Sequence, residues 1–177
     1  MTLDYIKSAR NQFQHYKNIS EKTFEQLNES SLFWKFNEES NSIAIIVKHL
    51  SGNMMSRWTD FLTTDGEKDW RKRDLEFESD IATKEEMMLK WNQGWECLFT
   101  ALDSISEHDL KSKMILIRNE EHTITEAINR QLAHYSYHIG QIIFIGKMKS
   151  NDWKSLTIPK GNSENYNSEM FSKKKFK

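Results

Sequence analysis

The feature that most restricts the possible folds of this chain is its small number of helix-breaking residues. Its 177 residues include a single proline, Pro159, and six glycines. So few breakers permit long helices and supply few of the tight turns that a sheet-rich fold needs. The length is typical of one domain with a sizeable core. We therefore expect an all-α protein, with one folded domain over residues 1–150 and a polar C-terminal extension over residues 151–177.

Apolar residues recur at helical spacing in four stretches. The stretches are residues 3–29, 43–61, 84–105 and 124–149. Ser42 is a suitable N-cap for the second stretch, and Thr83 and Thr123 are each followed three residues later by a glutamate, which is the pattern of a capping box. Four amphipathic helices predict a four-helix bundle with crossovers where the connectors are long.

Two connecting segments differ from ordinary loops. Residues 66–82 are highly charged and contain Trp70 and Phe77. Connectors of this length are often functional. A lid over a site would turn polar groups inward, whereas a packing strap would present only the two aromatic rings to the core, and both alternatives stay open. Residues 113–118 form a short β-prone run before the last helix, followed by an expected turn at residues 119–122.

The overall charge and the lone cysteine bear on compartment and partners. With 25 Lys and Arg against 26 Asp and Glu, the net charge of -1 gives no electrostatic footprint for nucleic acid. The basic runs at residues 71–73 and 173–175 are expected to be solvated. No apolar run could span a membrane, the N-terminus lacks the features of a signal peptide, and Cys97 cannot form an internal disulfide. We expect a cytoplasmic protein that binds neither nucleic acid nor a membrane.

His134 and His138 stand four residues apart in the last predicted helix. This spacing places both imidazoles on one helix face, within reach of one metal ion. Apolar residues and Tyr135 lie on the same side of the predicted helix as the two histidines, so the pair is expected to point into the bundle. Two core histidines hydrogen-bonded to backbone or tyrosine groups explain the same spacing equally well.

His49 is the candidate for a third ligand. It lies beside the apolar stripe of residues 43–61, and Asn53, one turn later, could hydrogen-bond its second ring nitrogen. Three imidazoles would leave coordination positions open, as in catalytic rather than structural metal sites. A carboxylate could add a fourth ligand. The candidates for it are Asp60, Glu96 and Glu126, whereas His15, His108 and His122 are expected on the surface or in a turn.

Several segments together resemble the DinB-like superfamily and, within it, the DUF1572 branch. They are SIAIIVKHLSGNM at residues 42–54, SRWTDFL at residues 56–62, DGEK at residues 65–68 and NRQLAHYSYHIGQI at residues 129–142. The resemblance implies a four-helix bundle that forms homodimers. It also implies that His49, His134 and His138 hold a divalent transition metal. Nickel or zinc is the first expectation, and iron or manganese the second.

Two functions from different classes follow. Some superfamily relatives are thiol S-transferases that use low-molecular-weight thiols, and others resemble metal-dependent hydrolases, so one expectation is an enzyme acting on a small molecule. Asn53 and Gln141 would then orient the ligands, and Tyr135 and Tyr137 would line the pocket. The alternative is a non-catalytic dimeric bundle with a vestigial or structural site. Its tryptophans would serve the core and the dimer interface, namely Trp58, Trp70, Trp91 and Trp95.

Overall fold

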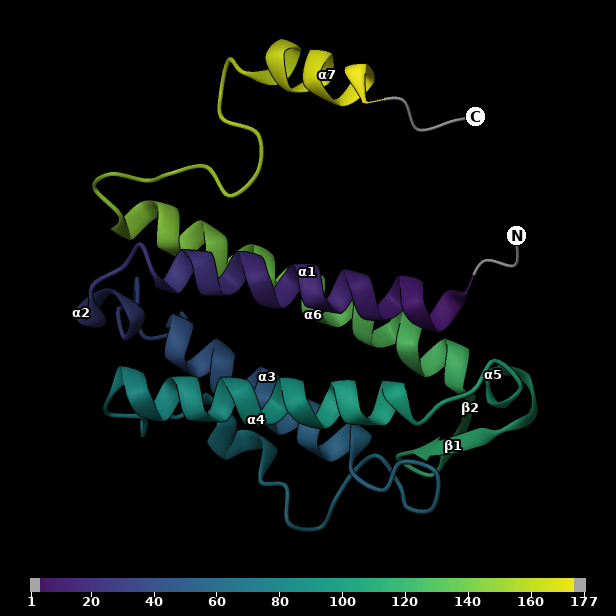
Figure 1. Ribbon diagram of the computed structural model, residues 1–177. Coiled ribbons are helices and arrows are strands. Elements are labelled where there is room, and N and C mark those ends of the chain that lie inside the picture. The colour runs from purple at the N-terminus through teal and green to yellow at the C-terminus, as the bar shows by residue number, and fades with distance from the viewer. Residues whose placement is uncertain (1–3, 174–177) are drawn as a thin grey trace.

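The computed structural model describes residues 4–173 and is mostly helical (Figure 1). Four long helices form its body: α1 (Tyr5–Phe24), α3 (Ile43–Trp58), α4 (Lys84–Asp103) and α6 (Ile124–Lys149). The short elements are α2 (Glu29–Leu32), the 3-10 helix η1 (Arg73–Phe77), α5 (Asp109–Ser112), β1 (Met114–Ile117), β2 (Glu120–Thr123) and α7 (Ser163–Ser172). The expected helical fold, with a small strand pair directly before the last long helix, is confirmed.

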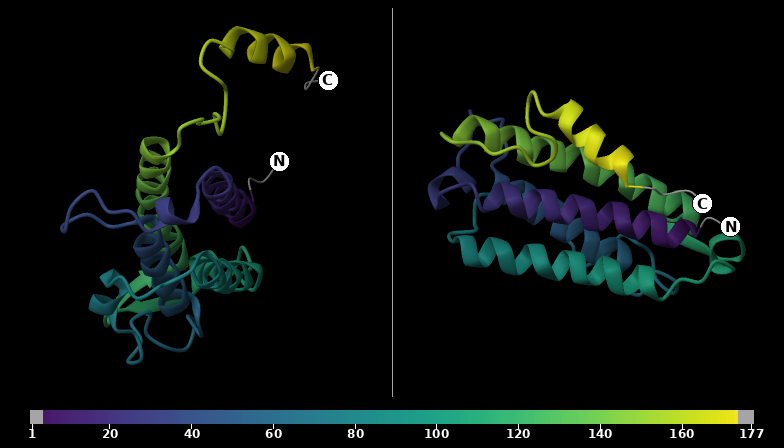
Figure 2. Two further views of the ribbon diagram at one scale, coloured as in Figure 1. Left: turned by 90° about the vertical axis from the view of Figure 1, so that its left-hand side faces the viewer. Right: turned by 45° about the horizontal axis from the view of Figure 1, so that its top comes forward.

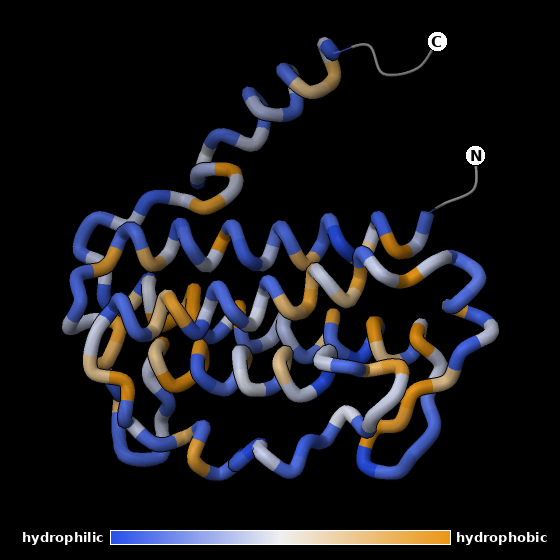
Figure 3. Tube along the Cα trace, turned by 60° about the horizontal axis from the view of Figure 1, so that its bottom comes forward, coloured by the Kyte–Doolittle hydropathy of each residue, from blue (hydrophilic) through white to orange (hydrophobic). Residues whose placement is uncertain are grey.

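Large aromatic rings fill the space between the four long helices. Helix α3 packs along α4, and α1 packs along α6 (Figure 2). Phe13, Trp95 and Tyr135 are fully buried at their meeting point, and the Phe13 ring contacts both of the others at centroid distances of 6.4 and 5.7 Å. Hydrophobic residues accordingly gather where helices face one another, whereas the outer turns are largely hydrophilic (Figure 3). Burying such rings is a major source of stability in a bundle of this size.

The helix starts follow the predicted caps, but α1, α3 and α4 end at Phe24, Trp58 and Asp103, before the predicted limits at residues 29, 61 and 105. Ser42 Oγ accepts a hydrogen bond from the backbone N–H of Ile45, and Thr123 forms a complete capping box with Glu126. Helix α3 ends at Trp58, three residues before the predicted limit. The backbone leaves the helix at Thr59, which is extended with a ψ of 124°, and the positive φ of 47° at Asp60 prevents the helix from resuming.

The β-prone run forms a hairpin that anchors the connector before α4. Strands β1 and β2 pair antiparallel, and the two-residue turn Arg118–Asn119 has positive φ values of 56° and 61°. The predicted turn at residues 119–122 was therefore wrong from Glu120 on, where β2 begins. The Asp65 carboxylate accepts hydrogen bonds from the backbone N–H groups of Arg118 and Asn119 at 2.8 and 2.7 Å. These bonds fix the connector against the hairpin.

The C-terminal segment contains one helix that was not predicted. Helix α7 has no buried residue and stands apart from the four long helices in two views (Figures 1 and 2). Of the basic run expected to be solvated at residues 173–175, Lys173 is exposed, and the other two residues lie outside the described part of the chain. The domain limit at residue 150 stays a prediction. Across residues 4–173, no helix is both long and apolar enough to cross a membrane.

Candidate metal centre

Helices α3 and α6 bring three histidines together. His49 comes from the middle of α3, and His134 and His138 come from successive turns of α6. One ring nitrogen of each lies within 4.8 Å of those of the other two. The three residues that the resemblance to a family implied as ligands therefore lie together. The site needs no long loop, because two packed helices position all three side chains.

The hydrogen bonds at the outer side of each ring define which nitrogen carries the proton. Each Nδ1 faces a side-chain oxygen. The three pairs are His49 with Glu76 at 2.9 Å, His134 with Gln131 at 3.3 Å and His138 with Gln141 at 2.9 Å. A carboxylate or an amide oxygen can only accept, so each Nδ1 donates. In a neutral imidazole the other nitrogen, Nε2, then presents a lone pair.

The three Nε2 atoms have no satisfactory hydrogen-bond partner within residues 4–173. His49 Nε2 lies 3.3 Å from His134 Nε2, and two lone pairs cannot bond to each other. His138 Nε2 is shielded from solvent and has no hydrogen-bond partner among the described residues. Nitrogens about 2.0–2.1 Å from a tetrahedral ion lie about 3.4 Å apart, which matches the first pair. The three histidines could therefore hold a metal ion.

Burial keeps the imidazoles of His134 and His138 in the neutral form that binds metals. Burial lowers the pKa of His134 to about 3, with help from repulsion by His138 and His49. Burial likewise lowers the pKa of His138 to about 4, although its hydrogen bond to Gln141 opposes the shift. Both rings are thus neutral near pH 7. A metal would not have to displace protons from them.

Glu76, on η1, is the functional residue that the sequence did not reveal. It is buried, and its carboxylate accepts hydrogen bonds from His49 and from Arg71, at 2.8 and 3.0 Å for the latter. Burial alone would raise the pKa of Glu76, but the hydrogen bonds from His49 and Arg71 bring it below its ordinary value. A carboxylate behind a ligating histidine orients the ring and raises its basicity as a ligand.

The connector over residues 66–82 therefore turns polar groups inward, as its interpretation as a lid requires. Arg71 and Glu76 belong to this connector and are both buried, and Phe77 stacks on the His49 ring at a centroid distance of 4.9 Å. Trp70, expected in the core under the alternative interpretation, is 56 % exposed. The length and charge of this segment were the only sequence signal for Glu76, and neither says which acid points inward.

Gly52 leaves room for the Glu76 carboxylate. A Cβ at position 52 would lie 2.2 Å from Glu76 Oε1, so Gly52→Ala must push the carboxylate away from His49 without removing its charge. We expect this variant to bind Zn²⁺ about tenfold to a hundredfold more weakly, the usual effect of disturbing such a partner. Titration against a chromophoric chelator measures the affinity. Gly140→Ala is the matched control, since a Cβ there meets nothing within 4 Å. Equal zinc affinity in both variants would contradict the role of Glu76.

The other predicted site residues divide between the site and the core. Gln141 reaches His138 as expected, and Tyr137 lines the cavity beside the histidines. Asn53 was wrongly predicted to support His49, because its amide oxygen accepts from the Tyr135 hydroxyl at 3.1 Å instead. Tyr135 belongs to the buried core. None of the carboxylate candidates joins the histidine cluster, namely Asp60, Glu96 and Glu126.

A cavity of about 610 Å³ opens beside the cluster, with His49 and His134 in its wall. Fold and site together define a mostly helical protein with three histidines that could hold a metal ion. The chain belongs to the DUF1572 family: the family model described as "Protein of unknown function (DUF1572)" matches residues 1–162. Among curated proteins, none matches the chain.

Proposed function

We propose that His49, His134 and His138 bind one divalent transition metal, with nickel or zinc as the expected ion. The observation that carries this proposal is the convergence of three Nε2 lone pairs, one of them on a buried atom without a partner. Imidazole nitrogen is a preferred ligand of both metals. The proposed three-histidine centre agrees with the resemblance to the DinB-like superfamily, and we propose that relationship as well.

We further propose that the protein is a metal-dependent enzyme of the thiol S-transferase or hydrolase type. Three protein ligands leave coordination positions open, whereas structural zinc sites use four. A divalent ion bound there would lower the pKa of a water or thiol ligand and supply a nucleophile near neutral pH. The chain's own part would be to orient the rings through Glu76, Gln131 and Gln141, and to admit a small molecule through the adjoining cavity.

Activity assays of the metal-free and the reconstituted protein test this proposal. Transfer of a low-molecular-weight thiol to an electrophile and hydrolysis of an activated ester would be followed after loading with Zn²⁺ or Ni²⁺. We expect at least one rate to depend on the metal and to be lost in His134→Ala. Rates that equal those of the metal-free protein in both assays would favour the non-catalytic bundle.

Removing the metal is expected to leave the fold intact. The core consists mainly of apolar and aromatic side chains from the four long helices, whereas only three side chains would hold the ion. The far-ultraviolet circular dichroism spectrum should therefore keep its helical shape after dialysis against a chelator, with a lower melting temperature as the only change. Loss of the helical signal on chelation would mean instead that the ion is structural.

We also propose that the protein is a cytoplasmic homodimer. An exposed apolar patch formed by Phe36, Phe144 and Met148 supports an interface, since their exposed fractions are 74 %, 64 % and 48 %. Light scattering should give about twice the chain mass of 21.1 kDa. Phe144→Glu should then yield monomers, whereas Phe171→Glu on α7 should not. A monomeric wild-type protein would overturn this proposal.

A further inference from the structure

The cavity beside the histidines is lined by an unusual concentration of positive charge. Five arginines face it, and its lining residues include no aspartate or glutamate. The arginines come from α3, the connector with η1, the hairpin turn and α6: Arg57, Arg71, Arg73, Arg118 and Arg130. Segments far apart in the sequence thus bring guanidinium groups to one hollow. The expectation that the basic run at residues 71–73 is solvated is wrong for Arg71, which is buried.

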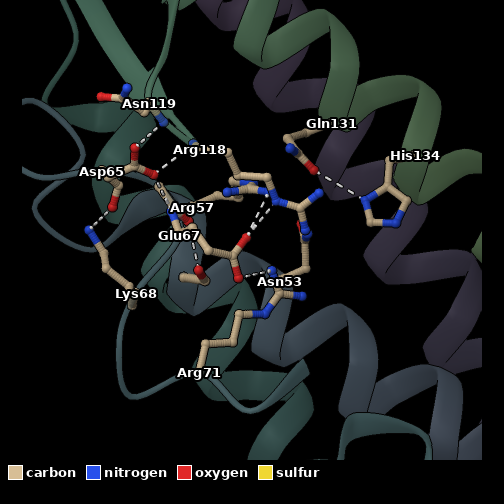
Figure 4. A network of polar contacts seen from close by, with 12 residues as sticks. Asn53, Arg57, Asp65, Glu67, Lys68, Arg71, Arg118, Asn119, Gln131 and His134 are labelled. Carbon is tan, nitrogen blue, oxygen red and sulfur yellow. Dashed lines mark hydrogen bonds and ion pairs between the residues drawn. The ribbon is translucent and has the colours of Figure 1, made fainter. Parts of the chain in front are cut away.

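Neighbouring carboxylates neutralise only part of this charge. Glu67 lies 3.4 Å from Arg57 Nη2 and 3.1 Å from Arg118 Nε, and Figure 4 shows it at the centre of this network. Glu76 forms an ion pair with Arg71. Arg73 and Arg130 form no ion pair with any acid in residues 4–173. Two carboxylates therefore face five guanidinium groups.

Arg57 is a buried member of the cluster whose charge is only partly compensated. Its exposed fraction is only 6 %, and its Nε and Nη1 are buried with no hydrogen-bond partner in residues 4–173. Burial and the nearby charges of Arg71, Arg118 and Arg130 lower its pKa, although Glu67 opposes this shift. Buried donors in native proteins are nearly always satisfied. An anion in the cavity would offset the repulsion between these guanidinium groups.

We propose that this cavity binds a carboxylate or phosphate group of the substrate, next to the histidine cluster. This inference rests on the proposed function, because it names the substrate class of the same site. Guanidinium groups match the planar oxygens of both anions and bind them with paired hydrogen bonds. The volume of about 610 Å³ is that of a small-molecule site. The acid-free wall selects against cationic ligands.

Binding of small anions to the metal-free protein tests the inference. Inorganic phosphate and malonate would each be titrated by calorimetry into the full-length chain, so that neither probe can bind an added metal. We expect Arg130→Gln to weaken binding about tenfold to a hundredfold, the effect of losing a charged hydrogen bond. Arg130 is exposed and forms no ion pair within residues 4–173, so we expect this variant to fold like the wild type. Arg57→Gln should have the same effect if it folds.

Arg10→Gln is the matched control. It removes the same charge from a partly exposed arginine that pairs with Asp103 on α4, outside the lining of the cavity. Tighter binding of malonate than of phosphate would assign a carboxylate substrate, and the reverse order a phosphate substrate. No binding of either probe, or an equal loss in Arg10→Gln and Arg130→Gln, would overturn the inference. So would an oligonucleotide that binds more tightly than both probes and depends on Arg130. Since no metal is present, none of these results bears on the proposed metal site.

Discussion

His134→Ala is expected to lower the affinity for Zn²⁺ or Ni²⁺ by roughly a hundredfold to a thousandfold. Zinc sites with four protein ligands bind with about 10–16 kcal/mol, so that one ligand contributes about 3–4 kcal/mol. His134 and His138 share one face of α6, and His49 on α3 faces them across the site. Removing His134 leaves two imidazoles from different helices. Competitive titration against a chelator of known affinity measures the loss.

His15→Ala separates the site from general effects of a lost histidine. His15 is exposed on α1 and lies outside the histidine cluster. We expect it to bind metal like the wild type. A His134→Ala protein that keeps wild-type affinity, at an unchanged melting temperature, would rule out the cluster as the ligand set.

Glu76→Ala should destabilise the protein by about 3 kcal/mol and weaken metal binding at the same time. The substitution leaves Arg71 buried without its two-bond partner, and breaking a buried ion pair from one side usually costs about 3–5 kcal/mol. We expect the lower end of this energy range, because Arg71 retains a contact with Glu67 at 3.7 Å. The loss of the acceptor behind His49 adds about a tenfold to hundredfold loss of metal affinity. Chemical denaturation measures the first effect and metal titration the second.

Glu78→Ala provides the comparison within the same connector. Glu78 is exposed, and its side chain forms no ion pair or hydrogen bond within residues 4–173. Its removal should change the free energy of unfolding by less than about 0.5 kcal/mol. If Glu76→Ala were equally mild, the buried triad of Arg71, Glu76 and His49 would not hold the connector in place.

The helices and the common face of His134 and His138 could be predicted from local patterns. Periodicity, caps and the scarcity of breakers define the four long helices because each signal acts within a few residues. The spacing of His134 and His138 fixes their common face in the same way. His49 needed the resemblance to a family, because its position beside the apolar stripe did not by itself show that it points toward α6.

The supporting residues could not be predicted, because they depend on contacts between distant segments. Glu76 reaches His49 across 27 positions, and nothing in a charged connector distinguishes it from its exposed neighbours. Asn53 illustrates the converse error. Its place one turn after His49 suggested a local hydrogen bond, but the buried Tyr135 hydroxyl 82 positions away takes its oxygen. The arginine-lined cavity likewise exists only once four segments have packed together.

Elemental analysis of the purified protein tests the three-histidine centre most directly. The wild type and His49→Ala would be prepared without a histidine tag or added metal, and nickel, zinc, iron and manganese would be measured per chain. We expect about one transition-metal ion per wild-type chain and nearly none in the variant. Wild-type protein that contains no metal, and takes up neither Ni²⁺ nor Zn²⁺ when they are added, would contradict the proposed site and favour a non-catalytic helical bundle.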